Sequence, residues 1–279
     1  MKRKKFKIKY QNIILLLLII IFVIIIIFCI KEILSWNKDN KETAKQVEII
    51  KENVEIKETE DSENTEIINP PETTIEEDPF NPYWDYINMN LMNVDFTELK
   101  NINSDTKGWI KVNGTTINYP FVETNNNDYY LTHSFDKSYN EAGWIFLDYR
   151  NNIGFLDKNT ILYGHGRLNK TMFGSLKNII NSNWYSNPDN YVIKMSTEAE
   201  NTLWQVFSVY RIPSTSDYLQ INFSSDNEYT KFLDKLKNRS VFNFNTTLNK
   251  DDKIITLSTC YDDNDKVVMH AKLIKYEKK

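Results

Sequence analysis

The 279-residue sequence contains only seven glycines, two cysteines and three histidines. Neither a GxGxxG nor a GxxxxGK[ST] string occurs, so the usual glycine-rich cradles for nucleotides are absent. Neither CxxC nor HExxH occurs, and so few sulfur and imidazole ligands predict no structural metal site and no cofactor. The sequence also lacks a GxSxG string, which disfavours a serine hydrolase.

Most of the chain carries no excess of positively charged side chains. Residues 1–36 carry seven basic side chains and one acidic one, whereas residues 37–79 carry five basic and fourteen acidic ones. Because the whole chain has a net charge of −4, residues 80–279 are nearly neutral. This balance argues against binding to nucleic acid.

One long apolar run is present, from Ile13 to Ile30, and Ile33–Leu34 could extend it. Its length makes it a candidate membrane span. The basic cluster at residues 2–9 places the N-terminus in the cytoplasm and the rest outside, by the positive-inside tendency. The alternative is a cleaved signal peptide, but the run exceeds a typical signal core and residues 32–36 offer no small-x-small cleavage site. We therefore predict a cytoplasmic tail over 1–12 and an uncleaved anchor over 13–34.

The following segment, residues 35–80, is rich in Glu, Lys, Thr and Asn and poor in aromatic residues. Such a segment buries too little apolar surface to offset the entropy lost on ordering. It is predicted to be an acidic stalk, disordered or partly helical around Lys41–Ile56. Residues 81–279 would then form one exported catalytic domain.

The exported domain is predicted to be mainly β, with eight or so strands. Asn113-Gly114 is a preferred two-residue hairpin turn, and a capping box at Ser225–Glu228 begins a helix over Asp226–Arg239. Two short helices are expected at Pro82–Leu91 and Asp95–Ile102. The strand-like runs, several with alternating apolar and polar residues, are Trp109–Val112, Thr115–Val122, Gly143–Tyr149, Thr160–Tyr163, Tyr191–Met195, Leu203–Ile212, Lys253–Thr259 and Val267–Tyr276. Pattern alone leaves barrel and sandwich open.

Two residues at the ends of such runs are candidates for chemistry. Cys260 ends the run from Ile254, where a thiol is fixed in position yet faces a loop region. His165 closes the run Ile161–Gly164, and Gly166 after it allows close approach of chain or substrate. The structural alternatives are a buried inert thiol and a surface histidine. Together the two residues favour a nucleophile with a nearby base.

The remaining candidates are weaker. His133 follows an Asn-rich loop and is expected to be exposed. His270 lies in the middle of a strand, where alternation predicts that it points to solvent. Asp148 or Asp157 could orient a base, although spacing favours neither.

These residues carry a family resemblance. Thr256–Cys260 resembles the TLxTC motif of sortases, the membrane-anchored cysteine transpeptidases of Gram-positive cell surfaces, and Tyr163–His165 resembles their histidine motif. The class B sortases in particular are similar at Gly114–Pro120, Asn127–Leu131, Ile145–Asn151 and Thr171–Leu176, and in the helix inserted at Asp226–Arg239. The similar segments occur in order over roughly residues 82–276.

The resemblance implies an eight-stranded sortase-type β-barrel with N-terminal helices and one inserted helix, preceded by the transmembrane helix. It also implies that Cys260 attacks the Thr carbonyl of a C-terminal sorting signal, NPxTx or a related PxTx motif, on a surface protein. His165 would protonate the leaving amine, and an amine of a peptidoglycan precursor or a pilin lysine would resolve the thioester. By the same resemblance, the substrate-binding residues would be Ser258, Thr259, Asn127 and Leu131.

One position departs from the family pattern. Sortases carry an arginine on the strand after the nucleophile, whereas Lys266 stands there in this sequence. Lysine keeps the positive charge but lacks the planar two-pronged donor of arginine. Three hypotheses are open: Lys266 substitutes at a reduced rate, another arginine such as Arg167 or Arg211 serves, or the enzyme is weak, specialised or inactive. The acidic side chains in Tyr261–Asp265 would also disfavour a thiolate.

The leading hypothesis is therefore a class B-like sortase on the outer face of the cytoplasmic membrane. A pilin-polymerising sortase is a second hypothesis, although the chain shows no second, C-terminal span. Two further hypotheses are a catalytically silent domain that only binds sorting peptides, and a simple cysteine peptidase.

Overall fold

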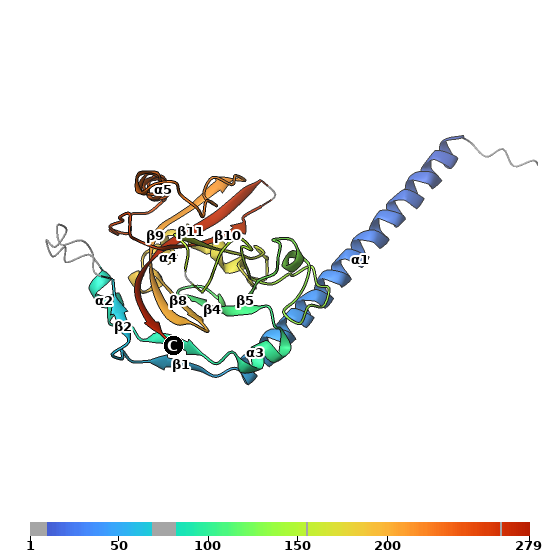
Figure 1. Cartoon of the computed structure of the whole chain (residues 1–279). Helices are drawn as coiled ribbons and strands as arrows, with labels where there is room; N and C mark the ends of the chain where they lie inside the picture. The colour runs from blue at the N-terminus through green and yellow to red at the C-terminus, as the bar shows by residue number, and fades with distance from the viewer. Residues whose placement is uncertain (1–9, 69–81, 155, 263) are drawn as a thin grey trace, which may run out of the picture. The chain divides into compact units, whose positions relative to one another are not determined.

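The computed structural model describes residues 10–68, 82–154, 156–262 and 264–279 (Figure 1). It divides into two compact units, residues 1–45 and residues 46–279. Most of the predicted cytoplasmic tail, the proline-containing end of the predicted stalk and Asp263 lie outside the described residues.

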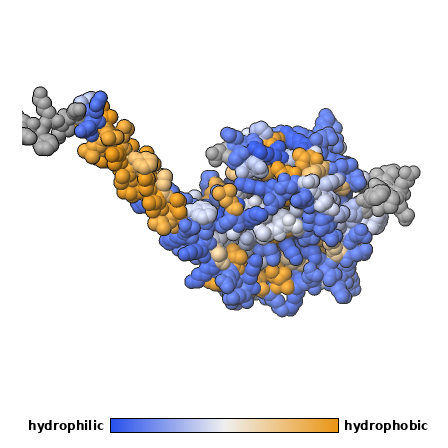
Figure 2. All heavy atoms as spheres, turned by 180° about the vertical axis from the view of Figure 1, so that it is seen from behind, coloured by the Kyte–Doolittle hydropathy of each residue, from blue (hydrophilic) through white to orange (hydrophobic). Residues whose placement is uncertain are grey.

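The apolar run forms the first part of a long helix, α1 (Tyr10–Asn53). Its aliphatic side chains from Ile13 to Ile27 are exposed to a large extent, and Figure 2 shows them as a continuous hydrophobic segment. In the described part of the chain, α1 is the one helix long and apolar enough to cross a membrane. It is therefore a candidate membrane anchor.

Eight strands close into a barrel in the order β10-β7-β6-β5-β4-β8-β9-β11, and β11 pairs back with β10. The β10–β7 and β5–β6 pairs are parallel and the other neighbours are antiparallel. The predicted eight-stranded barrel is thus confirmed. Its strands are β4 (Thr106–Val112), β5 (Asn118–Val122), β6 (Phe146–Leu147), β7 (Asn159–Tyr163), β8 (Val192–Thr197), β9 (Glu200–Pro213), β10 (Ile254–Cys260) and β11 (Asp265–Lys278).

The hairpin predicted at Asn113-Gly114 is present, but its turn is longer than two residues. Lys111 pairs with Asn118, and the Val112 amide donates to the Ile117 carbonyl at 3.0 Å. The connection is therefore the four residues 113–116. Thr115 explains the extra length, because its hydroxyl donates to the Val112 carbonyl at 2.8 Å and accepts from the Ile117 amide at 3.1 Å.

The helix predicted over Asp226–Arg239 is α5 (Asp226–Asn238), and the Ser225 hydroxyl caps it by accepting from the Glu228 amide. The apolar face of α5 packs in a cluster with residues of β9 and β11, away from the main core. The other helices are α2 (Tyr83–Ile87), α3 (Thr97–Ile102) and α4 (Ser182–Tyr185). Single 3₁₀ turns occur at Tyr129–Leu131, Gly174–Asn178 and Pro188–Asn190.

The partial helix expected around Lys41–Ile56 agrees with α1, which continues to Asn53, but the prediction of a stalk apart from the folded domain is wrong for residues 55–68. Strand β1 (Ile56–Thr59) pairs with β3 (Leu91–Val94), and β2 (Thr65–Ile67) adds to the free edge of β11. The acidic side chains predicted to be solvated instead meet barrel lysines: Lys194 binds Glu58 at 3.1 Å, and the buried Lys275 binds Asp61. We call residues 55–68 the N-terminal strap.

Candidate active site

The register of the barrel brings the three predicted catalytic residues together. Parallel pairing places Ser258 of β10 opposite Tyr163 of β7. Cys260 and His165 each follow two residues after this pair, so they emerge at the same end of the barrel. Antiparallel pairing places Lys266 of β11 directly opposite Cys260.

Lys266 lies against the predicted nucleophile. Its Nζ is 2.8 Å from the Cys260 Sγ, and the Cys260 side chain is exposed at the end of an otherwise buried strand. A positive charge at this distance stabilises negative charge on the sulfur or on an atom bonded to it. The structure therefore places a cation directly opposite the predicted nucleophile.

His165 is oriented by a backbone carbonyl rather than by a carboxylate. Its Nε2 lies 2.7 Å from the Leu131 carbonyl oxygen. Because a carbonyl can only accept, Nε2 carries a proton, and in the neutral ring Nδ1 is the basic nitrogen. The partners of Asp148 are Arg150, at 2.8 and 2.6 Å, and the Tyr163 hydroxyl, at 2.8 Å. Burial raises the pKa of Asp148, but these hydrogen bonds outweigh it and hold the pKa below the usual range.

Two glycines permit this close arrangement. A Cβ at Gly166 would lie 2.0 Å from the Cys260 carbonyl oxygen, so a side chain there would displace the nucleophile's strand. Gly143 has a φ of +60°, and a Cβ at this position would lie 2.8 Å from the His165 ring. Each glycine is therefore required by a neighbour in the site.

All seven predicted site residues line one cavity of about 710 Å³, which we call the Cys260 pocket. They are Cys260, His165, Lys266, Ser258, Thr259, Asn127 and Leu131. Three of them are fixed by hydrogen bonds: Thr259 donates to the Gly164 carbonyl at 2.7 Å, Ser258 shares a hydrogen bond with the Tyr218 hydroxyl at 2.9 Å, and Asn127 accepts from the Tyr149 amide at 3.1 Å. The pocket is thus built on a fixed set of side chains.

Sequence reasoning missed one wall of the Cys260 pocket. The connection between β9 and α5 contributes Ser214, Thr215, Ser216, Tyr218 and Leu219 to its lining. Asn159 of β7 holds this connection, because its amide donates to the carbonyls of Tyr218 and Gln220 at 3.2 and 2.9 Å. Asn159, a polar residue at the start of a buried strand, was the one sign in the sequence of this wall. Its hydrogen-bond partners are distant in sequence, so the sign could not be interpreted.

An arginine partly offsets the charge of the acidic loop after Cys260. Arg211 donates to Asp265 at 2.5 Å and to Asp262 at 2.8 Å, and its guanidinium lies 3.9 Å from the centre of the Tyr261 ring. The expected repulsion between this loop and a thiolate is thereby reduced. Because Arg211 is bound to Asp262 and Asp265, its guanidinium is not free to take the place of Lys266 beside Cys260.

The other two histidines differ from expectation. His270 is fully buried rather than facing solvent, because α5 covers this face of β11. The Tyr210 hydroxyl and the Thr256 hydroxyl each lie 2.8 Å from one of its ring nitrogens. His133 is half-buried and stacked on Tyr129, with ring centres 4.0 Å apart.

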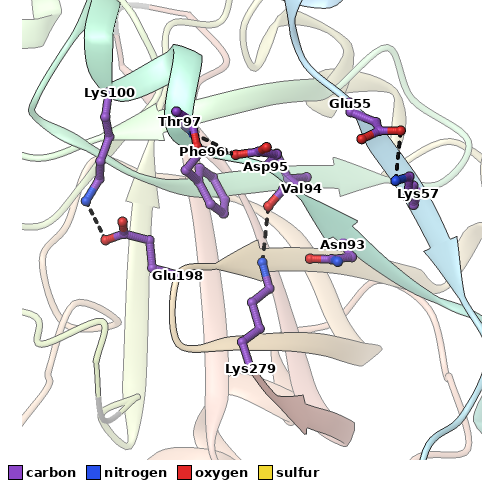
Figure 3. Close-up of a pocket in the computed structure, with 10 residues that line it drawn as sticks. All are labelled: Glu55, Lys57, Asn93, Val94, Asp95, Phe96, Thr97, Lys100, Glu198 and Lys279. Atoms are coloured by element: carbon purple, nitrogen blue, oxygen red, sulfur yellow. Dashed lines mark hydrogen bonds and ion pairs between the residues drawn. The ribbon is translucent and has the colours of Figure 1, made fainter.

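A second cavity of about 500 Å³ lies between β3, α3 and the chain end, and none of the predicted site residues lines it. Figure 3 shows two ion pairs in its lining, Lys100 with Glu198 and, two residues apart on one segment, Glu55 with Lys57. Lys279 donates to the Val94 carbonyl at 3.2 Å. The charged side chains of this cavity thus make ion pairs or hydrogen bonds with their own neighbours.

A closed β-barrel that presents a cysteine, a histidine and a cation in one pocket defines a class of cysteine transpeptidases. The sortase domain model matches residues 110–274, which is more than half of the chain. Sortase B of Staphylococcus aureus is 36% identical over 184 residues, covering 64% of this chain and 75% of that protein.

Solved structures agree. The S. aureus sortase B–substrate complex has 36% identity and a TM-score of 0.61, covering 64% of this chain and 84% of that chain. Sortase B from Bacillus anthracis in complex with AAEK1 has 32% identity and a TM-score of 0.66, covering 87% of this chain and 99% of that one. The chain belongs to the sortase family and resembles its class B members, cysteine transpeptidases of cell-wall protein sorting.

Proposed function

We propose that this sortase cleaves a C-terminal sorting signal of the NPxTx or PxTx type after its threonine and transfers the protein to a cell-wall amine. Cys260 is the nucleophile, His165 the general acid and base, and Lys266 the cation that stabilises the oxyanion. The observation that carries the proposal is the 2.8 Å contact between Lys266 Nζ and Cys260 Sγ, in the pocket that His165 also lines.

In the first step, the Cys260 thiol gives its proton to His165, the sulfur attacks the threonine carbonyl carbon, and the carbonyl oxygen becomes negatively charged. Lys266 lies close enough to the sulfur to donate to this oxygen. The C–N bond then breaks, His165 gives a proton to the leaving amine, and a thioester on Cys260 remains.

In the second step, an amine attacks the thioester carbon and Cys260 leaves as thiolate. His165 takes the proton that the attacking amine loses. The acceptor is the amine of a peptidoglycan precursor, or a pilin lysine if the enzyme polymerises pilin. Ser258, Thr259, Asn127 and Leu131 line the same pocket and contact the peptide.

The chemistry is tested with mixed NPxTx and LPxTx pentapeptides and intact-mass spectrometry. We expect an acyl adduct on the wild-type protein, no adduct with Cys260→Ala, and slow product release with His165→Ala. A soluble amine should divert the product from acid to amide, which a simple cysteine peptidase would not do. Binding of peptide without any adduct would support the silent peptide-binding domain instead.

The proposed location is the outer face of the cytoplasmic membrane, with α1 as a single-pass anchor and the N-terminus in the cytoplasm. The apolar surface of α1 and the basic residues before it support this orientation. Protease added to intact cells should remove residues 46–279 and leave a membrane-embedded fragment. Full protection of the chain would contradict the orientation.

A further inference from the structure

Lys266, the residue opposite Cys260, carries an amine, and an amine can act as a nucleophile as well as a cation. In the described part of the chain, Lys266 Nζ makes one hydrogen bond, to Cys260 Sγ at 2.8 Å, and no ion pair. The two carboxylates described in the preceding loop, Asp262 and Asp265, are bound to Arg211 instead. Lys266 is therefore held at the sulfur without an acidic partner among the residues that the structure describes.

Lysine and arginine differ at such a position in one decisive way. Arginine keeps its proton and cannot act as a nucleophile in a protein, whereas lysine can lose a proton and attack a carbonyl. In a thioester the acyl carbon is bonded directly to Sγ. An amine that contacts Sγ is therefore also within reach of that carbon.

We propose that Lys266 is an internal acyl acceptor, so that the enzyme acylates itself when no external amine arrives. This inference rests on the function proposed above, because it starts from the Cys260 thioester. The acyl group is a peptide that ends in the threonine of the sorting signal. The product is an amide, which the enzyme cannot readily reverse.

The step balances without any further reactant. Lys266 first loses one proton to solvent, and its Nζ lone pair attacks the thioester carbon. The C–S bond breaks, Cys260 leaves as thiolate, and the second proton released from the nitrogen restores the thiol. One amide bond has formed, one thioester bond has broken, and no oxidation or reduction has occurred.

Proximity makes this transfer competitive although most lysine side chains are protonated near neutral pH. Well-oriented intramolecular nucleophiles reach effective concentrations of about 10⁵ M or more, which offsets the small fraction of a lysine that is neutral near pH 7, and an external amine competes while the Lys266 amine is protonated. The positive charge of Lys266 disappears with the transfer. Acylated enzyme therefore loses its oxyanion donor and is blocked after one turnover.

The test uses the full-length protein in detergent with the mixed NPxTx and LPxTx peptides and no acceptor amine. After an acid quench, the sample is divided and one half is treated with neutral hydroxylamine, which cleaves thioesters and leaves amides. We expect a hydroxylamine-resistant adduct that peptide mapping assigns to Lys266. Added triglycine should reduce it, because an external amine competes for the same thioester.

Three variants make the result specific. Lys266→Arg should form only the hydroxylamine-sensitive adduct, with at least tenfold less resistant product than wild type. Lys177→Arg is the matched control, because Lys177 lies near Gly166 and over the Tyr261 ring, 5.8 Å from its centre, and its loss should change nothing. Cys260→Ala should form neither adduct.

The outcomes separate the two proposals. If the wild-type adduct is wholly hydroxylamine-sensitive, self-acylation is overturned and the thioester mechanism stands. Resistant adduct that persists in Lys266→Arg, or that maps to another residue, also overturns it. Absence of both adducts from the wild-type protein overturns the proposed function and the inference together.

Discussion

At the scale of single residues, the charge on Lys266 is the feature most open to measurement. Removing it by Lys266→Ala should lower kcat/KM by about 10²–10³, the usual cost of one oxyanion donor. Lys266→Arg keeps the charge and presents a planar two-pronged donor, so its turnover with an amine acceptor should equal or exceed that of wild type. Steady-state kinetic assays of the two variants with excess acceptor amine measure these effects. An unchanged kcat/KM in Lys266→Ala would show that Lys266 takes no part in the mechanism.

His270 predicts a pH dependence of stability. Burial, and then the charges of Arg239 and Lys235, lower its pKa to about 3, whereas an unfolded histidine titrates near 6.5. The unfolded state therefore binds the extra proton between these values, and stability falls as the pH falls below about 6.5. At pH 5 the loss from this residue is about 2 kcal/mol.

The measurement is urea unfolding of residues 46–279 at pH 5 and pH 7. His270→Gln should have a lower free energy of unfolding at both pH values. The decrease in that free energy from pH 7 to pH 5 should be about 2 kcal/mol smaller in His270→Gln than in wild type. His133→Gln is the control, because His133 is half-buried at a distant loop. Equal pH dependence in wild type and His270→Gln would contradict the assignment.

The same residue shows where a sequence pattern fails. The alternation of apolar and polar residues on β11 predicts that His270 faces solvent. That rule applies to a strand with one face buried and the other exposed to solvent. Residues 267–274 of β11 are instead buried on both faces, since the barrel interior lies on one side and α5 on the other. The placement of Cys260 and His165 in one pocket was predictable, because Cys260 ends a buried strand, His165 lies two residues beyond another, and the two strands are neighbours.

At the scale of elements, the connection between β9 and α5 governs one wall of the Cys260 pocket. Arg239, at the end of α5, donates to Asp217 at 3.0 and 2.6 Å, between the lining residues Ser216 and Tyr218. The hydrogen bond from Arg239 is the main cause that lowers the pKa of Asp217 to about 2. The ion pair is therefore intact above about pH 4 and is lost as the pH falls toward 2.

Asp217→Asn should loosen this wall and raise the peptide KM several-fold, with a smaller effect on kcat. Asp217 is 43% exposed, so its contribution to stability is about 1 kcal/mol or less. The matched control is Asp226→Asn at the other end of α5, where a similar ion pair joins Lys250. Equal KM values in the two variants would show that the wall does not depend on Asp217.

The elements themselves were largely predictable, and the exceptions have physical causes. The capping box at Ser225 and the apolar spacing of α5 depend on neighbouring residues, so sequence located this helix closely. Strand β2 has only three residues, two of them largely exposed, and no apolar pattern. It exists because β11 offers a free edge, and such a partner is invisible in a local pattern.

At the scale of the whole molecule, the N-terminal strap belongs to the catalytic unit. A protein of residues 82–279 lacks β1, β2 and Asp61, the acidic partner of the buried Lys275. Lys275 would keep only the Ile87 and Met89 carbonyls, at 2.8 and 3.1 Å. We expect it to be less stable than residues 46–279 by about 3 kcal/mol, or roughly 10 °C in Tm.

Thermal unfolding of the two proteins measures this difference. Lys275→Met in the shorter protein should recover part of the loss, because it removes the uncompensated buried charge. The same substitution in the longer protein should instead destabilise, since it removes a satisfied ion pair. Identical Tm values for the longer and shorter proteins would show that the strap contributes nothing.

Strand β11 also has a mechanical consequence. One end pairs with Cys260 through Lys266, and the other pairs with β2 of the strap through Lys275–Glu277. A pull between the N-terminal side of the catalytic unit and a protein held covalently on Cys260 therefore runs along β11. The ladder hydrogen bonds along β11 share that load. We expect an enzyme that holds one protein on Cys260 while it waits for an acceptor amine to bear tension along this strand.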